Sequence, residues 1–164
     1  MIRLLVLDVD GVLTDGGLFY GPDGEQVKRF NVRDGLGIKL LQQAGVTVAI
    51  ISGRSCAALD RRAADLGIAE LHCGVGDKGV VLADLQTRLG VVPGETAAMG
   101  DDLPDLALFA GAAHRIAPAD AERELIAAAT FVTSRTGGHG AVRDAAVHIL
   151  DLNGDGALSE RTTA

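Results

Sequence analysis

The stretch Ile2–Gly11, with the sequence IRLLVLDVDG, decides the fold, because an apolar run of strand length ends there in two carboxylates and a glycine. A continuous apolar run of this length is typical of a strand that is buried on both faces of a parallel sheet covered by helices. Residues two apart on a strand face the same way, so Asp8 and Asp10 both project beyond the end of this strand. Ligands of open α/β sheets bind at such carboxyl ends, and we therefore expect a binding site here.

Apolar runs of strand length alternate with segments of helical period along the rest of the chain. The predicted strands are residues 2–7, 46–51, 97–99, 114–117 and 131–133. The predicted helices are residues 35–43, 55–66, 78–89, 103–109, 119–128 and 140–150. This alternation predicts an α/β fold of three layers, with a Rossmann-like, mostly parallel sheet and helices on both of its faces.

A predicted β-hairpin interrupts the alternation, with strands at residues 18–20 and 26–30 and a four-residue turn at 21–24. This hairpin flap covers about residues 17–31, and no later loop is long enough for a separate cap domain.

We expect one domain over residues 1–150 and a tail over residues 151–164. The tail begins like a calcium-binding loop, but its twelfth position is Thr162 rather than Glu, so we assign no calcium site to it.

Composition narrows the class of protein. A chain of 164 residues has room for one core, and with aromatic residues at 3% that core must consist mainly of aliphatic side chains. The formal net charge of −7 disfavours nucleic acid and anionic membranes as partners. Neither a cleavable leader nor an apolar run of about 18 residues is evident. Two cysteines cannot build a disulfide framework, so we expect a cytoplasmic protein.

Polar side chains also follow the other predicted strands. Ser52 and Arg54 come directly after the strand at 46–51, and Asp101 comes after the strand at 97–99. Lys78 lies between them, at the start of a predicted helix. Because parallel strands end at the same edge of a sheet, we expect these side chains to converge with those of the first strand.

This set of residues is what phosphate transfer to a carboxylate requires. A nucleophilic carboxylate and a phosphate repel each other, by about 4 kcal/mol for unit charges at 4 Å and an effective dielectric constant of 20, so cations must offset the repulsion. We predict that Asp8 is the nucleophile and forms an aspartyl phosphate. Asp10 would donate a proton to the leaving group and then accept a proton from water. Lys78 supplies a fixed positive charge, and Ser52 contacts the phosphoryl oxygens. The predicted metal residues are Asp8, Asp10 and Asp101, which would hold Mg²⁺.

In this order the motifs resemble those of the haloacid dehalogenase superfamily of phosphatases, which map onto Asp8-x-Asp10, Ser52, Lys78 and Gly100-Asp101-Asp102-x-x-Asp105. The last residue, Asp105, either orients metal-bound water or is an ordinary first-turn helix residue. Both interpretations of Asp105 stay open.

Within that superfamily the chain resembles the 3-deoxy-D-manno-octulosonate 8-phosphate phosphatases, which lack a cap domain. The matching stretches are Asp8–Gly16, Phe30–Ile38, Ser52–Arg54, Gly100–Asp102 and Gly137–Arg143. The resemblance implies Mg²⁺-dependent hydrolysis of an eight-carbon sugar acid phosphate for lipopolysaccharide synthesis. It also implies homotetramers, assembled through the hairpins, in which a neighbouring subunit closes each active site. The positions carried over to the substrate site are Asp10, Asn31, Val32, Arg33, Asp34, Gly35, Lys39, Arg54, Arg62 and Lys78.

Three alternatives remain open. Relatives that act on a nine-carbon sugar acid carry Glu at the position of Arg54, so Arg54 favours the eight-carbon substrate. A broad-specificity sugar phosphatase is a second alternative. The third is a receiver-like phospho-switch, a class that the order of the motifs disfavours because Lys78 precedes Asp101 here.

His139 stands where we would expect Arg in relatives, so we assign it no role.

Overall fold

The computed structural model describes residues 1–155 and contains a six-stranded parallel sheet with the order β5-β4-β1-β6-β7-β8. The strands are β1 (Leu4–Leu7), β4 (Thr47–Ile51), β5 (Glu70–His72), β6 (Thr96–Met99), β7 (His114–Ala117) and β8 (Phe131–Val132). The chain extends the sheet from β1 toward β5 and then crosses back to place β6 on the other side of β1. The strand order therefore reverses between β1 and β6, which is where open α/β sheets bind ligands.

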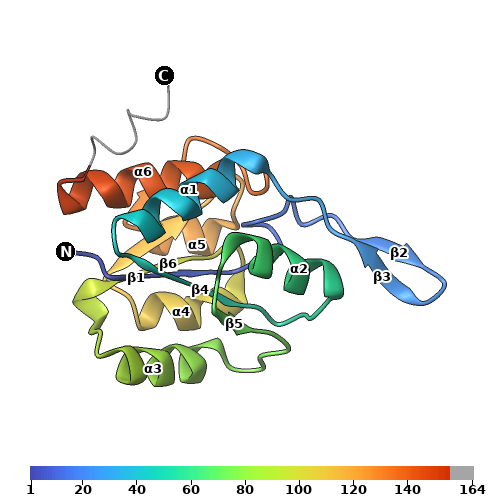
Figure 1. Cartoon of the computed structure of the whole chain (residues 1–164), viewed down its shortest axis with the longest axis horizontal. Coiled ribbons are helices and arrows are strands. Elements are labelled where there is room, and N and C mark those ends of the chain that lie inside the picture. Colours follow the sequence, from blue (N-terminus) through green and yellow to red (C-terminus); the bar gives the residue numbers. More distant parts are fainter. Residues whose placement is uncertain (156–164) are drawn as a thin grey trace.

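Successive side chains of β1 point to opposite faces of the sheet, so the core has two halves, one on each face. Leu5 and Leu7 belong to one apolar cluster, and Leu4 and Val6 belong to the other. The first cluster includes buried side chains of α1 (Val32–Gln43), α2 (Ala57–Leu66) and α6 (Ala141–Asn153). The second includes those of α3 (Lys78–Leu89), α4 (Leu106–Ala110) and α5 (Arg123–Ala128). Figure 1 shows α1 and α6 above the sheet, with α3 and α4 below it. The predicted three-layer α/β fold is confirmed.

Most element boundaries agree with the sequence to within a few residues. The helix predicted at 78–89 matches α3, whereas α1 begins three residues earlier than predicted because Asn31 caps it, accepting from the backbone N–H of Arg33 at 2.8 Å. The segment predicted as one helix at 103–109 is a 3₁₀ turn at Leu103–Asp105 followed by α4. The helix predicted from residue 119 begins only at Arg123, since a turn closed by Ala121 N–H on the Pro118 carbonyl precedes it.

The hairpin consists of β2 (Phe19–Gly21) and β3 (Gly24–Val27), which pair antiparallel and extend away from the body of the molecule (Figure 1). The predicted four-residue turn was wrong, because Gly21 pairs with Gly24 and leaves only two residues between the strands. Gly24 has a φ of +106°, a backbone conformation that glycine adopts without strain. The side chains of Phe19 and Tyr20 are exposed on this hairpin.

At the other end of the chain, α6 continues into the predicted tail as far as Asn153. The Asn153 amide accepts from the Ile2 N–H at 2.7 Å and donates to the Ile2 carbonyl at 2.8 Å. Asn153, the third residue of the calcium-loop pattern in the tail, therefore binds the backbone of Ile2, two residues before β1. The later part of the predicted tail, residues 156–164, lies outside the described residues. Within residues 1–155, no helix is long and apolar enough to cross a membrane.

Candidate active site

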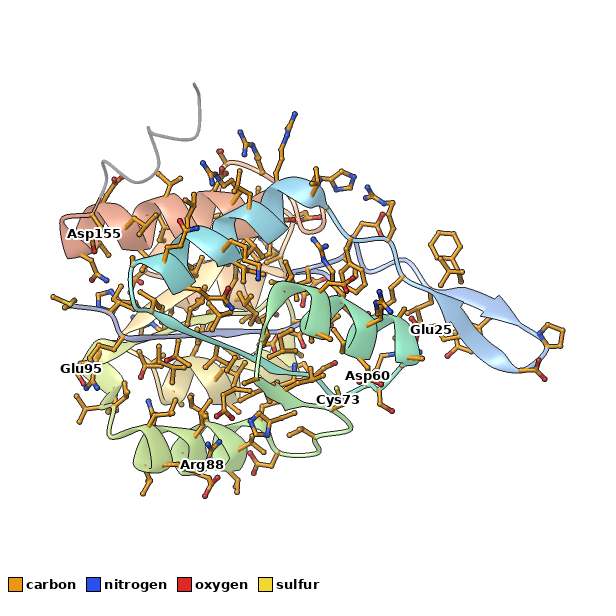
Figure 2. All side chains as sticks on the ribbon, in the orientation of Figure 1. Glu25, Asp60, Cys73, Arg88, Glu95 and Asp155 are labelled. Atoms are coloured by element: carbon orange, nitrogen blue, oxygen red, sulfur yellow. The ribbon has the colours of Figure 1, made fainter. Side chains whose placement is uncertain are left out.

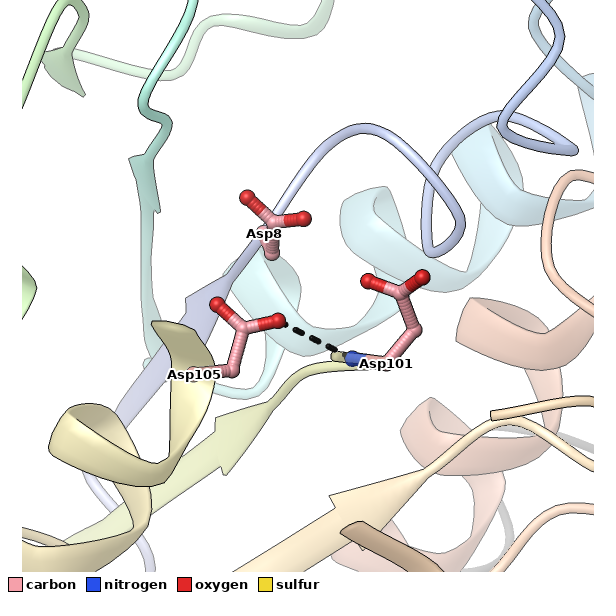
Figure 3. A group of neighbouring side chains, drawn as sticks. All are labelled: Asp8, Asp101 and Asp105. Atoms are coloured by element: carbon pink, nitrogen blue, oxygen red, sulfur yellow. Dashed lines mark hydrogen bonds between the residues drawn. The ribbon is translucent and has the colours of Figure 1, made fainter. Parts of the chain in front are cut away.

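Three carboxylates meet at the carboxyl edge of the sheet (Figure 3). Asp8 follows β1, Asp101 follows β6, and Asp105 lies in the 3₁₀ turn that comes next. One carboxylate oxygen of each residue lies within 4.8 Å of the others. Asp105 is held by the local backbone, since its Oδ2 accepts from the N–H of Asp101 at 3.0 Å and from the N–H of Asp102 at 3.4 Å. Residues 93 positions apart in the chain thus share one site because their strands are neighbours in the sheet.

Lys78 is the cation of this cluster. Its ammonium donates to Asp8 Oδ1 and to Asp105 Oδ1, both at 2.6 Å, and its side chain is buried. The residue begins α3, whose N-terminus is capped by Asp77 accepting from the N–H of Gly79 at 2.9 Å. The ammonium is therefore fixed between two carboxylates and is not a mobile, solvent-exposed group.

The protonation equilibria of the cluster are strongly perturbed. Burial, reinforced by the nearby Asp105, raises the pKa of Asp8 to about 6, although Lys78 opposes the shift. Burial and the charges of Asp8 and Asp105 raise the pKa of Asp101 to about 7. Burial alone would lower the pKa of Lys78, but the two adjacent carboxylates outweigh it and raise that pKa. Three carboxylates around one ammonium therefore leave an excess of negative charge.

This donor set fits a divalent cation. Hard carboxylate oxygens are the ligands that Mg²⁺ prefers. A cation would also relieve the repulsion between carboxylates that, together with the larger effect of burial, raises the pKa values of Asp8 and Asp101. The backbone is shaped around the same group, since Gly11 has a φ of +90° and a Cβ there would overlap the Asp101 carboxylate. The loop after β1 can thus approach the carboxylates only with glycine at this position.

A cavity of about 380 Å³ opens over the cluster. It is lined by Asp8, Asp10, Ser52, Gly53, Arg54, Val75, Gly76, Lys78, Asp101, Asp102, Pro104 and Asp105. Ser52 directly follows β4. Its hydroxyl accepts from the N–H of Arg54 at 3.2 Å, and its backbone N–H donates to the His72 carbonyl at 2.8 Å. The structure therefore brings Asp8, Asp10, Ser52, Lys78 and Asp101 to one cavity, as the sequence predicts. A larger hollow of about 480 Å³ between β8 and α6 contains none of the predicted residues.

Asp10 lies in the cavity but outside the carboxylate cluster. Its carboxylate is paired with the buried ammonium of Lys28, and Nε of Arg54 lies 3.8 Å from it. Among the described residues, the oxygens placed to hold a metal belong to Asp8, Asp101 and Asp105. Sequence reasoning left the role of Asp105 open and placed Asp10 in the metal set.

Most of the other predicted substrate residues do not line this cavity in the single chain. Asn31 caps α1, with Val32 and Arg33 exposed in its first turn. Lys39 Nζ donates to the Leu66 carbonyl at 2.6 Å, and Arg62 Nη2 donates to the Asn31 carbonyl at 3.2 Å. Val32, Arg33 and Lys39 thus lie on α1, which follows the hairpin in the chain, and Arg62 lies on α2.

Asp34 and Gly35 have structural contacts in the same region. The buried Asp34 carboxylate accepts from the N–H of Arg143 at 3.0 Å and so joins α1 to the start of α6. A Cβ at Gly35 would overlap the Arg62 guanidinium, so this glycine leaves room for that side chain.

Sequence reasoning missed two charged residues of the hairpin, Glu25 and Lys28. They form an ion pair at 2.6 Å, and their side chains are 8% and 1% exposed. The available signal is a Glu and a Lys three positions apart in the hairpin, next to the acidic motif. The sequence predicts no more than a flap there.

Comparison with known proteins identifies the family of this chain. Residues 67–144 match the family model described as haloacid dehalogenase-like hydrolase. The chain is 44% identical over 159 residues to the 3-deoxy-D-manno-octulosonate 8-phosphate phosphatase KdsC of Escherichia coli (strain K12), covering 97% of this chain and 84% of that protein. Over 157 residues it is also 44% identical to KdsC of Haemophilus influenzae, covering 96% of this chain and 87% of that protein.

Solved structures agree in fold over nearly the whole chain. The cobalt-bound form of the Haemophilus influenzae phosphatase superposes with a TM-score of 0.93 at 44% identity, covering 96% of this chain and 92% of that chain. The Moraxella catarrhalis phosphatase, solved with a magnesium ion, a phosphate ion and a KDO molecule, superposes with a TM-score of 0.94 at 39% identity. That match covers 99% of this chain and 94% of the other. The chain therefore belongs to the haloacid dehalogenase-like hydrolases, in the family of the 3-deoxy-D-manno-octulosonate 8-phosphate phosphatases.

Proposed function

We propose that this protein hydrolyses 3-deoxy-D-manno-octulosonate 8-phosphate to the free sugar acid and phosphate, through an aspartyl phosphate on Asp8. One observation carries the proposal. The Asp8 carboxylate, held by Lys78 at 2.6 Å, lies in one cavity with Asp10, Ser52 and the carboxylate of Asp101. The relatives named for this activity, at 44% identity over almost the whole chain, supply the substrate class.

The reaction has two steps. The Asp8 carboxylate attacks phosphorus while the bond from phosphorus to the sugar oxygen breaks, and Asp10 gives that oxygen its proton. Asp10 then takes a proton from water, the resulting hydroxide attacks phosphorus, and phosphate leaves with the Asp8 carboxylate restored. Lys78 orients Asp8 and offsets the negative charge that collects around phosphorus, and the Ser52 hydroxyl donates to a phosphoryl oxygen.

Mg²⁺ is the cofactor that this site favours. Bound there, it would neutralise charge on the phosphate and on the carboxylates, and Asp8 and Asp101 would hold it with a further oxygen from Asp10 or Asp105. The magnesium and phosphate ions in the Moraxella catarrhalis relative support this assignment.

Arg54 is the residue that we assign to the carboxylate of the sugar acid. It lines the cavity beside Asp10, and its side chain is 40% exposed, so the guanidinium can reach a bound ligand. A guanidinium suits a carboxylate because it is always charged and makes strong, charge-assisted hydrogen bonds to carboxylate oxygens. The eight-carbon sugar acid, a precursor for lipopolysaccharide, is the substrate that Arg54 favours over the nine-carbon one.

We also infer a cytoplasmic homotetramer that assembles through the hairpins. The exposed Phe19, Tyr20 and Val27 lie on the hairpin, which extends beyond the body of the subunit (Figure 1). The predicted substrate residues that lie outside their own cavity, Asn31–Gly35, Lys39 and Arg62, belong to the cap and body of α1, which follows that hairpin in the chain, and to α2. In an assembly they would line a neighbour's site, which accounts for the absence of a cap domain from residues 1–155.

The test is phosphate release from purified protein with Mg²⁺, with kcat/KM compared for eight-carbon and nine-carbon sugar acid phosphates. We expect a preference of about 10-fold or more for the eight-carbon substrate. Equal values for the two would overturn the assigned substrate, and failure to release phosphate from either would overturn the assigned activity.

A further inference from the structure

Two residues of the hairpin hold Arg54. Tyr20 and Glu25 are opposite each other in the hairpin register, so their side chains leave the hairpin close together. Nη2 of Arg54 donates to the Tyr20 hydroxyl at 2.8 Å and to Glu25 Oε2 at 3.3 Å. The guanidinium at the cavity wall is thus bound to the hairpin and not only to its own loop.

Glu25 also connects this arginine to Asp10. Its Oε1 lies 2.6 Å from the Lys28 ammonium, which is itself paired with Asp10. Hydrogen bonds from Lys28 and then from Arg54 outweigh the cost of burial and hold the pKa of Glu25 below its ordinary value, so the residue is a carboxylate at neutral pH. Two cations and two carboxylates therefore form one closed network at the root of the hairpin. Figure 2 shows Glu25 on the hairpin, on the side of the molecule away from Glu95.

The contacts leave one part of the guanidinium available. Nε of Arg54 is buried, lies 3.8 Å from Asp10 Oδ2 and has no hydrogen-bond partner. Nη2 is occupied by the hairpin, and no side chain among the described residues accepts from Nη1. Because a guanidinium is planar, fixing the edge formed by Nε and Nη2 also fixes the direction of Nη1.

We propose that Glu25 is a positioning residue, which orients Arg54 and thereby makes the enzyme select phosphate esters that carry a carboxylate. A preoriented guanidinium loses little conformational freedom when a carboxylate binds, whereas an unrestrained Arg54 must be ordered by the ligand. The inference rests on the proposed function in that it takes Arg54 as the carboxylate contact. It goes further by placing the control of selectivity in the hairpin.

The experiment compares Glu25→Gln with the unmodified protein on two substrates, the eight-carbon sugar acid phosphate and p-nitrophenyl phosphate, which has no carboxylate. We expect KM for the sugar acid phosphate to rise about 10-fold, the effect of losing one charge-assisted contact, with kcat changed less than about twofold. Both constants for p-nitrophenyl phosphate should stay within about twofold. An equal loss of kcat/KM on both substrates would show a general structural role for Glu25 and would overturn the proposal. A lower KM for the sugar acid phosphate would also overturn it, because it would mean that Glu25 competes with the ligand for Arg54.

Glu70→Gln is the matched control, because Glu70 is also paired with an arginine, Arg88, at 2.7 Å and does not line the cavity. Glu70→Gln should leave kcat and KM unchanged for both substrates. The double variant with Arg54→Ala makes the test specific, since Glu25→Gln should add nothing once Arg54 is gone. If the effects of the two substitutions on KM for the sugar acid phosphate are fully additive, the inference is overturned.

The two proposals fail in different ways. If the unmodified protein shows no preference for carboxylate-bearing esters, the assigned substrate and this inference both fall. If it shows that preference and Glu25→Gln keeps it, only the positioning role of Glu25 is overturned.

Discussion

Asp8 is the residue whose loss should separate chemistry from folding. Asp8→Asn keeps the size and one oxygen of the side chain but removes the carboxylate that we propose as the nucleophile, so phosphate release should fall by about 1000-fold or more. Lys78 keeps its contact with Asp105, and circular dichroism and the melting temperature should show an intact fold. Asp60→Asn, the same change at an exposed position on α2, should keep full activity. Comparable activity of the two variants would contradict the proposed nucleophile.

The raised pKa values of Asp8 and Asp101 predict how stability depends on pH. A carboxyl group with a higher pKa in the folded state stabilises the fold fully below its unfolded value, here 3.8, and this contribution is lost as the pH rises through the folded values of about 6 and about 7. The carboxylates whose pKa is lowered, such as Glu25 and Glu70, act in the opposite direction but only at more acidic pH. Without metal, the melting temperature should therefore fall between about pH 5 and about pH 7.5.

Mg²⁺ should reverse that dependence, because it binds the deprotonated carboxylates and stabilises the folded state by mass action. Thermal melts in excess Mg²⁺ should show a larger increase in melting temperature at about pH 7.5 than at about pH 5. Equal increases at the two pH values would argue that the cation binds elsewhere.

How far the site could be predicted depends on the kind of contact. Asp8, Asp101 and Lys78 could be placed because each directly follows or begins a regular element, so the topology alone brings them together. Glu25 could not, because its role comes from side-chain contacts between the hairpin and the cavity. Asp105 was ambiguous for a related reason: it caps its own turn and also accepts from Lys78, and only the three-dimensional arrangement shows both.

At the scale of elements, the loop before α6 supports the loop that follows β1. A Cβ at Gly137 would overlap the Gly11 carbonyl oxygen, and the N–H of Gly138 donates to the Val12 carbonyl at 3.0 Å. Gly137→Ala should therefore lower the free energy of unfolding by about 3 kcal/mol, at the upper end of the range for overpacking, as measured by urea denaturation. Gly94→Ala, at a position where a Cβ meets nothing within 4 Å, should change it by less than about 0.5 kcal/mol. A similar effect of both changes would show that the two loops do not depend on this close approach.

Elements were predictable from sequence where apolar pattern and burial coincide. The central strands and α3 have long apolar or amphipathic patterns, and the structure places them close to the predicted positions. β5 was missed because Glu70–His72 is a short, half-buried edge strand whose two polar side chains give no apolar run. It is held by pairing with β4, which is a property of the sheet and not of those three residues.

At the scale of the whole molecule, the hairpin should control assembly. Phe19→Asp places a charge on a side chain that is 54% exposed in the single subunit, so the subunit itself should keep its fold and its melting profile. In a tetramer built through the hairpins, the same charge would be buried, and light scattering should show smaller particles. Val92→Asp, an equally exposed apolar position at 57% away from the hairpin, is the control and should leave the particle size unchanged. An unchanged particle size for Phe19→Asp would overturn assembly through the hairpins.

The central position of β1 has a consequence for the newly made chain. Both of its sheet neighbours, β4 and β6, come later in the sequence, and the lysine that contacts Asp8 lies 70 residues downstream. During translation Asp8, the proposed nucleophile, leaves the ribosome among the first residues, yet its neighbours Asp101 and Asp105 emerge only after β6. Domains fold as units during synthesis, so capture of the cation should mark the last stage of maturation.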